Sequence, residues 1–600
     1  MGALPPKPLL SLTVGIVGHR LNRLPLEARV RVAAQVNELL GLIAKTARDA
    51  WERHGQVFTK EPPALRLISA LAEGADRIGA SGALEHGYSL TAILPFGVEE
   101  YARDFKQQSS KKEYERLLDK AETTLVLPGC RAQEAVAYET AGLTLVDNSD
   151  LLLAVWDGGA PAGWGGTIAF IERAARNDLP IIHVDAKGEQ EPRILWSGLA
   201  RFRASGAGIF ELPASDLTSA LPTVVDEFVR PPKDETENLK LSRYFGETWK
   251  PRNWRLELPL LLAFLGLRPL RKTDFRSKEP TALAIDFESH ASCRVQERLR
   301  QRPSDALSRV ALAYGWADAL GIRYAQVFRG AYTSNFICAA LAVLAGVTSL
   351  VGTQLFGWPS WPLAVVEAAL LGFIFINTYV GRKADWHSRW RESRAVAERL
   401  RAAELLWLVA LPLTLSRASE VTWTAWYVLA QMRGLGLAAG ALDKARLDAI
   451  RRSLITVVEA QRTYHAHNAS VMRGVERRIE GLGYVLIGLA ILLAAVNIIV
   501  ALSGQNMPVK LDYLLVGLIA ALPALGAATF GIRLIGDFEG VADSSDRTNA
   551  ILSDLGEALR HDQPDLAVLR SRARSIADVM LGDVSHWLIT TETRRLVEPA

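Results

Sequence analysis

The chain has 600 residues, 22% of them charged, and a formal net charge of only +4, so its composition does not point to a nucleic-acid partner. Its three cysteines are far apart and lack the spacing of a zinc site or a disulfide framework, which favours a reducing compartment. A mean hydropathy of +0.11 is intermediate between soluble and multi-span membrane proteins. We therefore expect several domains of different character and no bound metal.

In the first half of the chain, short β-rich runs alternate with helical stretches from residue 9 to about residue 229. Most of the β-rich runs lack polar alternation, as strands covered on both faces do. Strands separated by helices predict an α/β fold with a doubly wound parallel sheet, whose ligands bind beyond the carboxyl ends of the strands. The expected strands are 11–17, 64–70, 89–94, 123–127, 151–156 and 180–184.

Three of the loops that leave these strands carry glycines and polar side chains suited to an anionic ligand. Glycine permits close approach of the backbone, and the helix expected after the third loop offers free N–H groups at its start. Each loop alone also fits a tight turn or a helix cap, but the three together predict a phosphate or nucleotide site. The candidate residues are Gly15, Gly18, His19 and Arg20 after the first strand, Ser69, Glu73, Gly74, Asp76 and Arg77 after the second, and Asp157, Gly158, Gly165, Gly166 and Thr167 after the fifth.

The stretch 69–84 with the strand 90–94 resembles the signature of the Rossmann-like SLOG superfamily, which includes the DNA-processing Smf/DprA proteins and the LOG nucleotide phosphoribohydrolases. The segment 149–184 resembles the second phosphate loop of that superfamily. The resemblance extends over about 9–186 and implies a cytosolic pocket for a nucleotide or nucleotide-derived ligand, without a further cofactor.

One position departs from the hydrolases of this superfamily. LOG enzymes have a glutamate three residues beyond the Gly-Thr pair, where this chain has Phe170, and Glu172 lies on a different face of the helix. Cleavage of an N-glycosidic bond needs a carboxylate within hydrogen-bond reach of the sugar. Glu73, Asp76 or Asp157 would have to supply it, so we favour a sensing site over a hydrolase.

Four apolar runs in the second half are each close to the roughly 20 residues that cross about 30 Å of hydrocarbon: 336–356, 361–380, 484–502 and 513–532. They form two hairpins with short tips, and the alternative is large buried hairpins of a soluble helical protein. Arginine and lysine flank the inner ends of the runs and are nearly absent from the tips. The positive-inside rule therefore places both tips outside and the large soluble segments, with both termini, in the cytoplasm.

The start of the chain has prolines and no apolar core of a cleavable signal, so insertion would depend on the internal spans. Two shorter apolar runs, 258–267 and 405–415, each contain a proline and predict buried or interfacial helices. Within the spans we single out Glu367, Asn377 and Asn497, because polar groups in lipid normally face a partner or water. Glu367 is the expected pore or interhelix residue, and a position near the outer interface is the alternative.

The first hairpin, the Trp- and Arg-rich stretch 384–401 and the later stretch 461–465 resemble the SLATT family. Members of this family are two-span effector domains that occur beside SLOG sensors in bacterial conflict systems. The resemblance covers about 323–467 and is one of layout, and the second hairpin goes beyond it. It implies a multi-pass effector in the cytoplasmic (inner) membrane of a bacterium.

Together these features predict a membrane-bound effector of antiphage defence. Its sensor would bind a nucleotide-derived second messenger, and its transmembrane half would oligomerise or open to disrupt the membrane. The expected partners are the signalling molecule, the lipid bilayer and further copies of the chain, with no nucleic acid. A membrane-tethered nucleotide hydrolase and a ligand-gated ion channel are the alternatives. The expected parts are a nucleotide-sensing domain (9–229), transmission helices (230–322), a first hairpin with a cytosolic extension (323–480) and a second hairpin with C-terminal helices (481–600).

Overall fold

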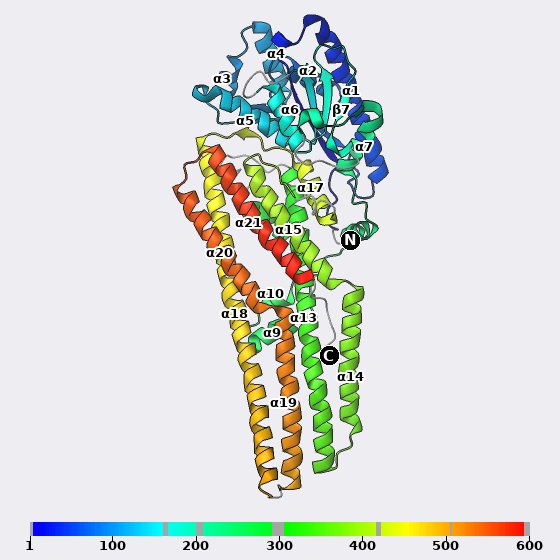
Figure 1. Cartoon of the computed structure of the whole chain (residues 1–600), viewed down its shortest axis with the longest axis vertical. Helices are drawn as coiled ribbons and strands as arrows, with labels where there is room; N and C mark the ends of the chain where they lie inside the picture. The colour runs from blue at the N-terminus through cyan, green and yellow to red at the C-terminus, as the bar shows by residue number, and fades with distance from the viewer. Residues whose placement is uncertain are drawn as a thin grey trace.

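The molecule is elongated, with an α/β domain at one end and two long helical hairpins at the other (Figure 1). The computed structural model describes residues 4–159, 166–199, 208–290, 305–415, 422–504 and 507–592. The fold class is the one predicted from the sequence, an α/β domain with a largely parallel sheet followed by a helical part.

Among the described residues the sheet has nine strands, in the order β8-β7-β6-β5-β1-β2-β3-β4-β9. The predicted strands are β1 (Ser11–Gly18), β2 (Ala64–Ser69), β3 (Ser89–Leu94), β4 (Thr123–Val126), β5 (Leu151–Trp156) and β6 (Ile181–Asp185), and neighbours within this set pair in parallel. After β4 the chain crosses to the other side of β1, so the strand order reverses between β1 and β5. β7 (Arg193–Leu195) and β8 (Ala214–Asp216) continue the sheet beyond β6 as antiparallel strands that the sequence did not indicate.

Helices cover both faces of this sheet. α1 (Leu26–His54) packs against α2 (Ala75–Glu85) and α7 (Leu217–Val229), whereas α5 (Glu134–Asp147) and α6 (Thr167–Arg176) pack against each other. Right-handed crossovers in opposite directions from β1 place these two groups on opposite faces. The apolar residues of α1, such as Val32, Val36 and Ile43, recur at helical spacing because this stripe is buried. α3 (Val98–Ala102) and α4 (Gln108–Asp119) join β3 to β4.

The helical part begins with short helices and continues with long ones. α8 (Glu235–Phe245), α9 (Glu257–Phe264), α10 (Lys272–Phe275) and α11 (Pro280–His290) precede α13 (Asp305–Phe356). The following helices are α14 (Trp361–Lys383), α15 (Trp386–Leu408), α17 (Trp423–Leu435), α18 (Lys444–Leu502), α19 (Val509–Gly536), α20 (Phe538–His561) and α21 (Leu566–Glu592).

Within the part of the chain that the structure describes, four helical stretches are long and apolar enough to cross a membrane: α13, α14, α18 and the stretch formed by α19 with α20. Only 17% of the most apolar window of α13 and 6% of that of α18 is buried inside the molecule. Their apolar side chains therefore point outward, and lipid explains this exposure better than water does. These surfaces are consistent with the predicted multi-pass membrane protein and not with hairpins buried in a soluble core.

One predicted helix is shorter than the sequence suggests. The run 405–415 predicts a helix, but α15 ends at Leu408, and 411–415 has no regular structure. Pro412 has no N–H to donate and disfavours helical geometry in Leu411, so the chain leaves the helix there. Leu411 remains buried, and its N–H donates to Leu406 O at 3.0 Å. The run 258–267 forms the short helix α9, on which Leu262 is buried and Phe264 is exposed.

The two halves of the chain share one sheet. β9 (Gly440–Ala441), which follows α17, pairs in parallel with Leu125 and Val126 of β4. The N–H of Leu442 donates to Val126 O at 2.8 Å, and Asp443 then caps the start of α18. α18 has 59 residues and is therefore about 88 Å long. One continuous helix thus leads from the edge of the sheet to the third predicted span.

α17 and α21 contact the amino-terminal side of the sheet. Arg433 Nε of α17 lies 2.9 Å from Oδ1 of Asp150, which directly precedes β5. Arg66, near the start of β2, donates to Gly434 O at 2.7 Å. Arg570 of α21 donates to Thr144 Oγ1 in the last turn of α5 at 2.9 Å. The carboxyl ends of β1, β2 and β5 therefore lie on the side of the sheet away from these contacts.

Candidate functional site

The carboxyl ends of β1, β2 and β5 bring the three predicted loops into contact. His19 N–H donates to Val155 O at 3.0 Å, and Ala75 N–H donates to His19 O at 3.2 Å. Thr167 Oγ1 donates to Gly18 O at 3.1 Å. The Gly18-His19 pair therefore touches both other loops. This meeting point lies where the strand order reverses between β1 and β5, the position at which open α/β sheets bind ligands.

Two glycines make this close approach possible. A Cβ on Gly18 would lie 2.5 Å from the Cβ of Ala75 and 2.8 Å from Val155 O. Gly74 has a φ of +99°, and a Cβ there would lie 2.5 Å from His19 O. A side chain at either position would push the loops apart, so both glycines shape the site through the backbone.

His19 and Asp157 lie within hydrogen-bond distance of each other at this point. His19 Nε2 lies 3.0 Å from Asp157 Oδ1, and Nη2 of Arg23, a residue that sequence reasoning missed, lies 3.1 Å from Asp157 Oδ2. Gly159 N–H also donates to Asp157 Oδ1 at 3.1 Å. Burial raises the pKa of Asp157, but the contacts with His19, Gly159 and Arg23 outweigh it and hold the pKa at about 2. Asp157 is therefore an anion near neutral pH and can accept a hydrogen bond from a hydroxyl group.

Asp76 is a second carboxylate, and its pKa is raised, whereas that of Asp157 is lowered. Its side chain is buried, and its Oδ2 accepts from Ala72 N–H at 3.3 Å. Burial raises the pKa of Asp76 to about 7, although the Ala72 N–H and the positive charges of Arg20 and Arg77 lower it. A carboxyl group with this pKa can exchange its proton near neutrality.

Arg20 stands beside polar and aromatic residues that the sequence analysis did not single out. Its guanidinium carbon lies 5.4 Å from the centre of the Tyr138 ring. The Tyr138 hydroxyl donates to Asp104, and burial together with this carboxylate raises the pKa of Tyr138 to about 12. Asp104 also pairs with Arg131 at 2.7 Å. In the sequence, only the segment 129–131, which has a glycine and a cation before a helix, could have indicated that Arg131, Asp104 and Tyr138 lie near the site.

Two other predicted site residues, Arg77 and Glu73, form hydrogen bonds and ion pairs with residues of the same domain. Arg77 is buried, donates to Ser110 Oγ at 2.8 Å and pairs with Glu113 at 3.0 Å. Glu73 accepts a hydrogen bond from the Ser110 hydroxyl. Arg77 and Glu73 therefore connect the start of α2 to α4, while the buried Nη2 of Arg77 has no hydrogen-bond partner among the described residues.

Two more of the predicted residues lie inside the domain. Ser69 is buried, and its hydroxyl accepts from Leu71 N–H at 3.0 Å in the turn after β2. Gly15 lies within β1, where a Cβ would lie 2.2 Å from Ser149 Oγ. Gly158 has no described neighbour within 4 Å of the position that a Cβ would take. Gly165 lies outside the described residues.

The start of α6 completes the site. Gly166 is the N-cap residue, is exposed and has extended backbone angles that any residue adopts. Among the described residues no side chain caps this helix, and its first N–H groups face the end that an anion would approach. Phe170 packs on α5, because a Cβ on Gly142 would lie 2.2 Å from its ring. α6 thus offers backbone donors at the site, whereas the ring of Phe170 is directed to α5.

In the membrane part, Asn377 belongs to a polar network between α13 and α14. Its Nδ2 donates to Asn335 Oδ1 at 2.7 Å and to Ala331 O at 3.2 Å. Asn335 Nδ2 donates in turn to Thr378 Oγ1 at 2.9 Å. Arg255, which precedes α9, donates to Asn377 Oδ1. The network therefore ties the segment before α9 to the first hairpin.

Glu367 and Asn497 have different surroundings. Glu367 is partly exposed and reaches α13, where a Cβ on Gly346 would lie 3.2 Å from its Oε2. It therefore lies between the two helices of one hairpin. Asn497 is partly exposed on α18. A search of the described side chains found no group of three or more His, Cys, Asp or Glu that could hold a metal ion.

Comparison with known proteins adds one match. Residues 313–411 match the model of a family described as Protein of unknown function (DUF4231). The matched segment contains most of α13, all of α14 and α15, and the polar network around Asn377. A comparison with curated proteins found no match. The family match thus delimits a unit around the first hairpin and carries no activity in its description.

Proposed function

We propose that this chain is a membrane-bound effector that senses a nucleotide or nucleotide-derived ligand at the carboxyl edge of its sheet. In this proposal the N-terminal domain is a SLOG-type sensor and the first hairpin a SLATT-like effector of bacterial antiphage defence. The four spans lie in the bacterial cytoplasmic membrane, with both termini in the cytoplasm, and respond to ligand by oligomerising or opening. Coupling free energies between such sites are typically about 1 to 3 kcal/mol, and the ligand must prefer one arrangement of the helices.

The observation that carries this proposal is the direct connection between sheet and membrane. Only two residues separate α18 from β9, which is itself hydrogen-bonded to β4 in the sheet. Because α18 is continuous over 59 residues and about 88 Å long, a small rotation of the edge strand moves the third predicted span at the far end of this helix. A binding domain attached by a flexible linker would not need a strand of its sheet to continue directly into a spanning helix.

α5 offers a second path through the sensor. Tyr138, near its start, lies beside Arg20 at the candidate site, whereas Thr144, near its end, accepts from Arg570 of α21. The helix has 14 residues and is about 21 Å long. A phosphate that attracted Arg20 away from the Tyr138 ring would alter the packing at the start of α5, and the end of the same helix touches the helical half.

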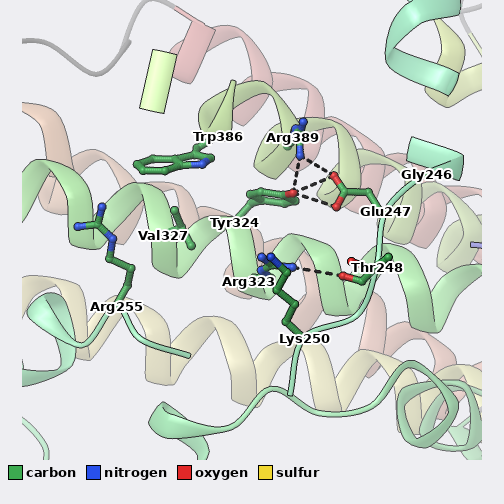
Figure 2. A pocket seen from close by; sticks show the side chains of 10 residues that line it. All are labelled: Gly246, Glu247, Thr248, Lys250, Arg255, Arg323, Tyr324, Val327, Trp386 and Arg389. Carbon is green, nitrogen blue, oxygen red and sulfur yellow. Dashed lines mark hydrogen bonds and ion pairs between the residues drawn. The ribbon is translucent and has the colours of Figure 1, made fainter. Parts of the chain in front are cut away.

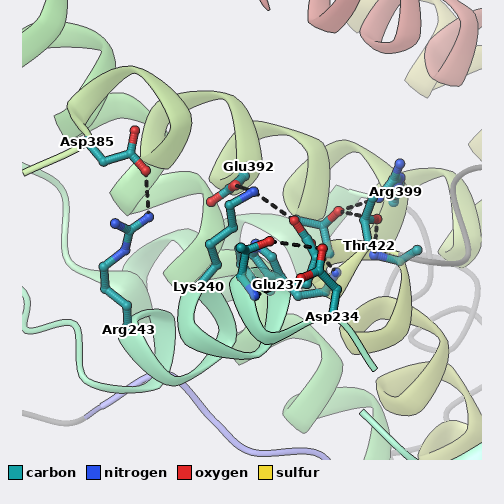
Figure 3. A network of polar contacts seen from close by, with 12 residues as sticks. Asp234, Glu237, Lys240, Arg243, Asp385, Glu392, Arg399 and Thr422 are labelled. Carbon is teal, nitrogen blue, oxygen red and sulfur yellow. Dashed lines mark hydrogen bonds and ion pairs between the residues drawn. The ribbon is translucent and has the colours of Figure 1, made fainter. Parts of the chain in front are cut away.

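α8, the first helix after the sensor, is fastened to α15 by ion pairs (Figure 3). Lys240 lies 3.2 Å from Glu392, and Arg243 lies 2.9 Å from Asp385, which directly precedes α15. α15 itself follows the second span. The segment that leaves the sensor is therefore in direct contact with the cytosolic end of the first hairpin, as a transmission element should be.

A membrane-tethered nucleotide hydrolase is the second candidate, because of Asp76. A general acid or base works best with a pKa near the operating pH, and the pKa of Asp76 is about 7. Asp157, with a pKa of about 2, cannot donate a proton near neutrality. Asp76 is thus the carboxylate that would carry hydrolysis if the ligand were turned over.

The test is to identify what the whole protein retains. Detergent-purified protein is incubated with a bacterial metabolite extract, washed and heated, and the released nucleotides are identified by mass spectrometry. Gly166→Trp should retain none, because the indole would cover the start of α6, whereas Glu172→Gln, which changes an ion-paired surface position of the same helix, should retain the wild-type amount. Equal retention by both variants would refute the site, and a hydrolysed product that disappears in Asp76→Asn would favour the enzyme.

A further inference from the structure

A cavity of about 380 Å³, remote from the sheet, lies where the segment after α8 meets α13 and the start of α15 (Figure 2). The segment contributes Glu247, Lys250 and Arg255 to the lining, and α13 contributes Arg323 and Tyr324. Trp386 and Arg389 line it from the first turn of α15. The volume falls within the range of about 300 to 1,000 Å³ that is usual for small-ligand sites.

The lining of this interfacial cavity has an excess of positive charge. It contains four cations, Lys250, Arg255, Arg323 and Arg389, against the single carboxylate of Glu247. Glu247 pairs with Arg389 at 2.8 Å and also accepts from the Tyr324 hydroxyl at 2.8 Å.

The cations that line the cavity differ in how many of their N–H groups already have a hydrogen-bond partner. Arg323 Nη1 donates to Thr248 O at 3.3 Å, a long contact, and neither Arg323 nor Lys250 pairs with the carboxylate that lines the cavity. The buried Nε of Arg389 has no hydrogen-bond partner among the described residues. An arginine donor that is buried without a partner is costly, and this one belongs to a residue that lines the cavity.

The cavity lies at the depth of lipid headgroups. Trp386 comes three residues after Lys383, where α14 ends, and six residues after 380, the end of the second predicted span, so it lies near the inner end of that span. The polar layer of a leaflet is about 5 to 8 Å thick, and tryptophan is enriched there. Arg255 links this level to the hydrocarbon boundary, because it stacks on Trp386 at 5.4 Å and donates to Asn377 inside the second span.

The segment that borders the cavity also exposes large apolar side chains. Trp254 is 82% exposed and Phe264, at the end of α9, is 81% exposed. α9 packs on α13 beside Gly330, where a Cβ would lie 2.7 Å from Glu257 Oε2. Side chains of this kind that flank a basic cavity at the membrane level indicate contact with acyl chains.

We propose that the interfacial cavity binds the phosphate of an anionic phospholipid from the adjacent leaflet. Lys250 and Arg323 receive the phosphate oxygens, and the acyl chains remain in the bilayer beside Trp254 and Phe264. A bound phosphate also competes with Asn377 for Arg255, so lipid occupancy acts on the polar network of the first hairpin. This site is independent of the nucleotide site on the sheet.

The test uses the full chain, reconstituted in vesicles of phosphatidylcholine mixed with phosphatidylglycerol. After transfer to detergent, the phosphatidylglycerol that stays bound is measured by native mass spectrometry across a series of lipid concentrations. The double variant K250A/R323A should bind it about 30-fold more weakly, since two cations near the headgroup are lost. The matched control R477A/R478A removes two exposed arginines near the start of the third span, outside the cavity, and should bind as the wild type does.

Two further arms decide the source of the phosphate. Soluble glycerol phosphate, the headgroup without its chains, should not displace the lipid, whereas short-chain phosphatidylglycerol should. Displacement by glycerol phosphate at equal concentration would assign the cavity to a soluble phosphate and overturn the lipid assignment. Unchanged binding in K250A/R323A, or an equal loss in both double variants, would overturn the cavity itself, and circular dichroism of each variant verifies that the helices are intact.

Discussion

Replacing Asp76 with asparagine tests the electrostatics of the candidate site without knowledge of its ligand. The group has a pKa of about 7 in the folded protein and 3.8 as an ordinary aspartate. Because the folded state holds the proton more tightly, ionisation of Asp76 opposes folding. This destabilisation is absent below about pH 4, grows as the pH rises and becomes constant above about pH 7. Asparagine keeps an oxygen for the Ala72 N–H and cannot ionise.

The size of this destabilisation follows from the pKa shift of Asp76. One pKa unit corresponds to about 1.4 kcal/mol, so between about pH 5 and about pH 8 the wild type should lose about 2 to 3 kcal/mol of local stability around Asp76. Asp76→Asn should lack this loss, and it should be more stable than the wild type by a larger margin at about pH 8 than at about pH 5.

Hydrogen–deuterium exchange of the α2 amides in the full chain measures this local stability, after correction for the intrinsic pH dependence of exchange. Asp157→Asn is the matched control: its folded pKa of about 2 lies below 3.8, so the stability it contributes is present above about pH 4 and is lost only as the pH falls further. Between about pH 5 and about pH 8, the local stability of Asp157→Asn should therefore be lower than that of the wild type by a constant amount. If Asp76→Asn keeps the slope of the wild type, Asp76 does not titrate near neutrality, and the hydrolase candidate loses its support.

Cysteines introduced at Ser360 and Gly504 of a cysteine-free chain should react with an impermeant thiol reagent in intact cells, because cations gather at the opposite ends of the spans; labelling at Ser388 instead would reverse the topology. Asn377→Leu should weaken the first hairpin by about 1 to 2 kcal/mol in mixed-micelle unfolding, since it removes three hydrogen bonds that average about 0.6 kcal/mol each between membrane helices; a change near zero would mean that water already satisfies these groups. Vesicles that hold the protein should retain dye until the ligand is added, and Glu367→Leu should change the leak rate or ion preference if that carboxylate borders the path; vesicles that stay sealed with ligand bound would reject the permeabilising mechanism.

The elements that could be predicted are those whose own residues determine them. The strand 151–156 is apolar throughout and is fully buried as β5, and the spans are recognisable by length and hydropathy. β9 could not be predicted, because Gly440 and Ala441 have low strand propensity and pair only because β4 presents a free edge. The end of α15 depends on Pro412, a local signal that the apolar run obscures.

For the candidate site, the sequence indicates which loops meet but not how each side chain is used. His19 and Asp157 lie together at the predicted place, since both directly follow strands that are neighbours in the sheet. Arg77 has the same local features, yet its donors bind Ser110 and Glu113 in the next connection. Tyr138 of α5 lies beside Arg20, which follows β1, although the two residues are far apart in the sequence, and such proximity depends on the strand order.

The pairing of β9 with β4 also determines how this protein can be taken apart. A fragment that stops at the end of α7 would leave the backbone groups of β4 without their neighbour, and a free sheet edge is a template for pairing with another chain. Such a fragment is therefore prone to aggregate or to borrow the missing strand from a second copy. A chimera that exchanges α/β domains between related chains needs two junctions, one after α7 and one that carries 437–443 with the incoming domain. Loss of the helical half by proteolysis would remove part of the sheet as well.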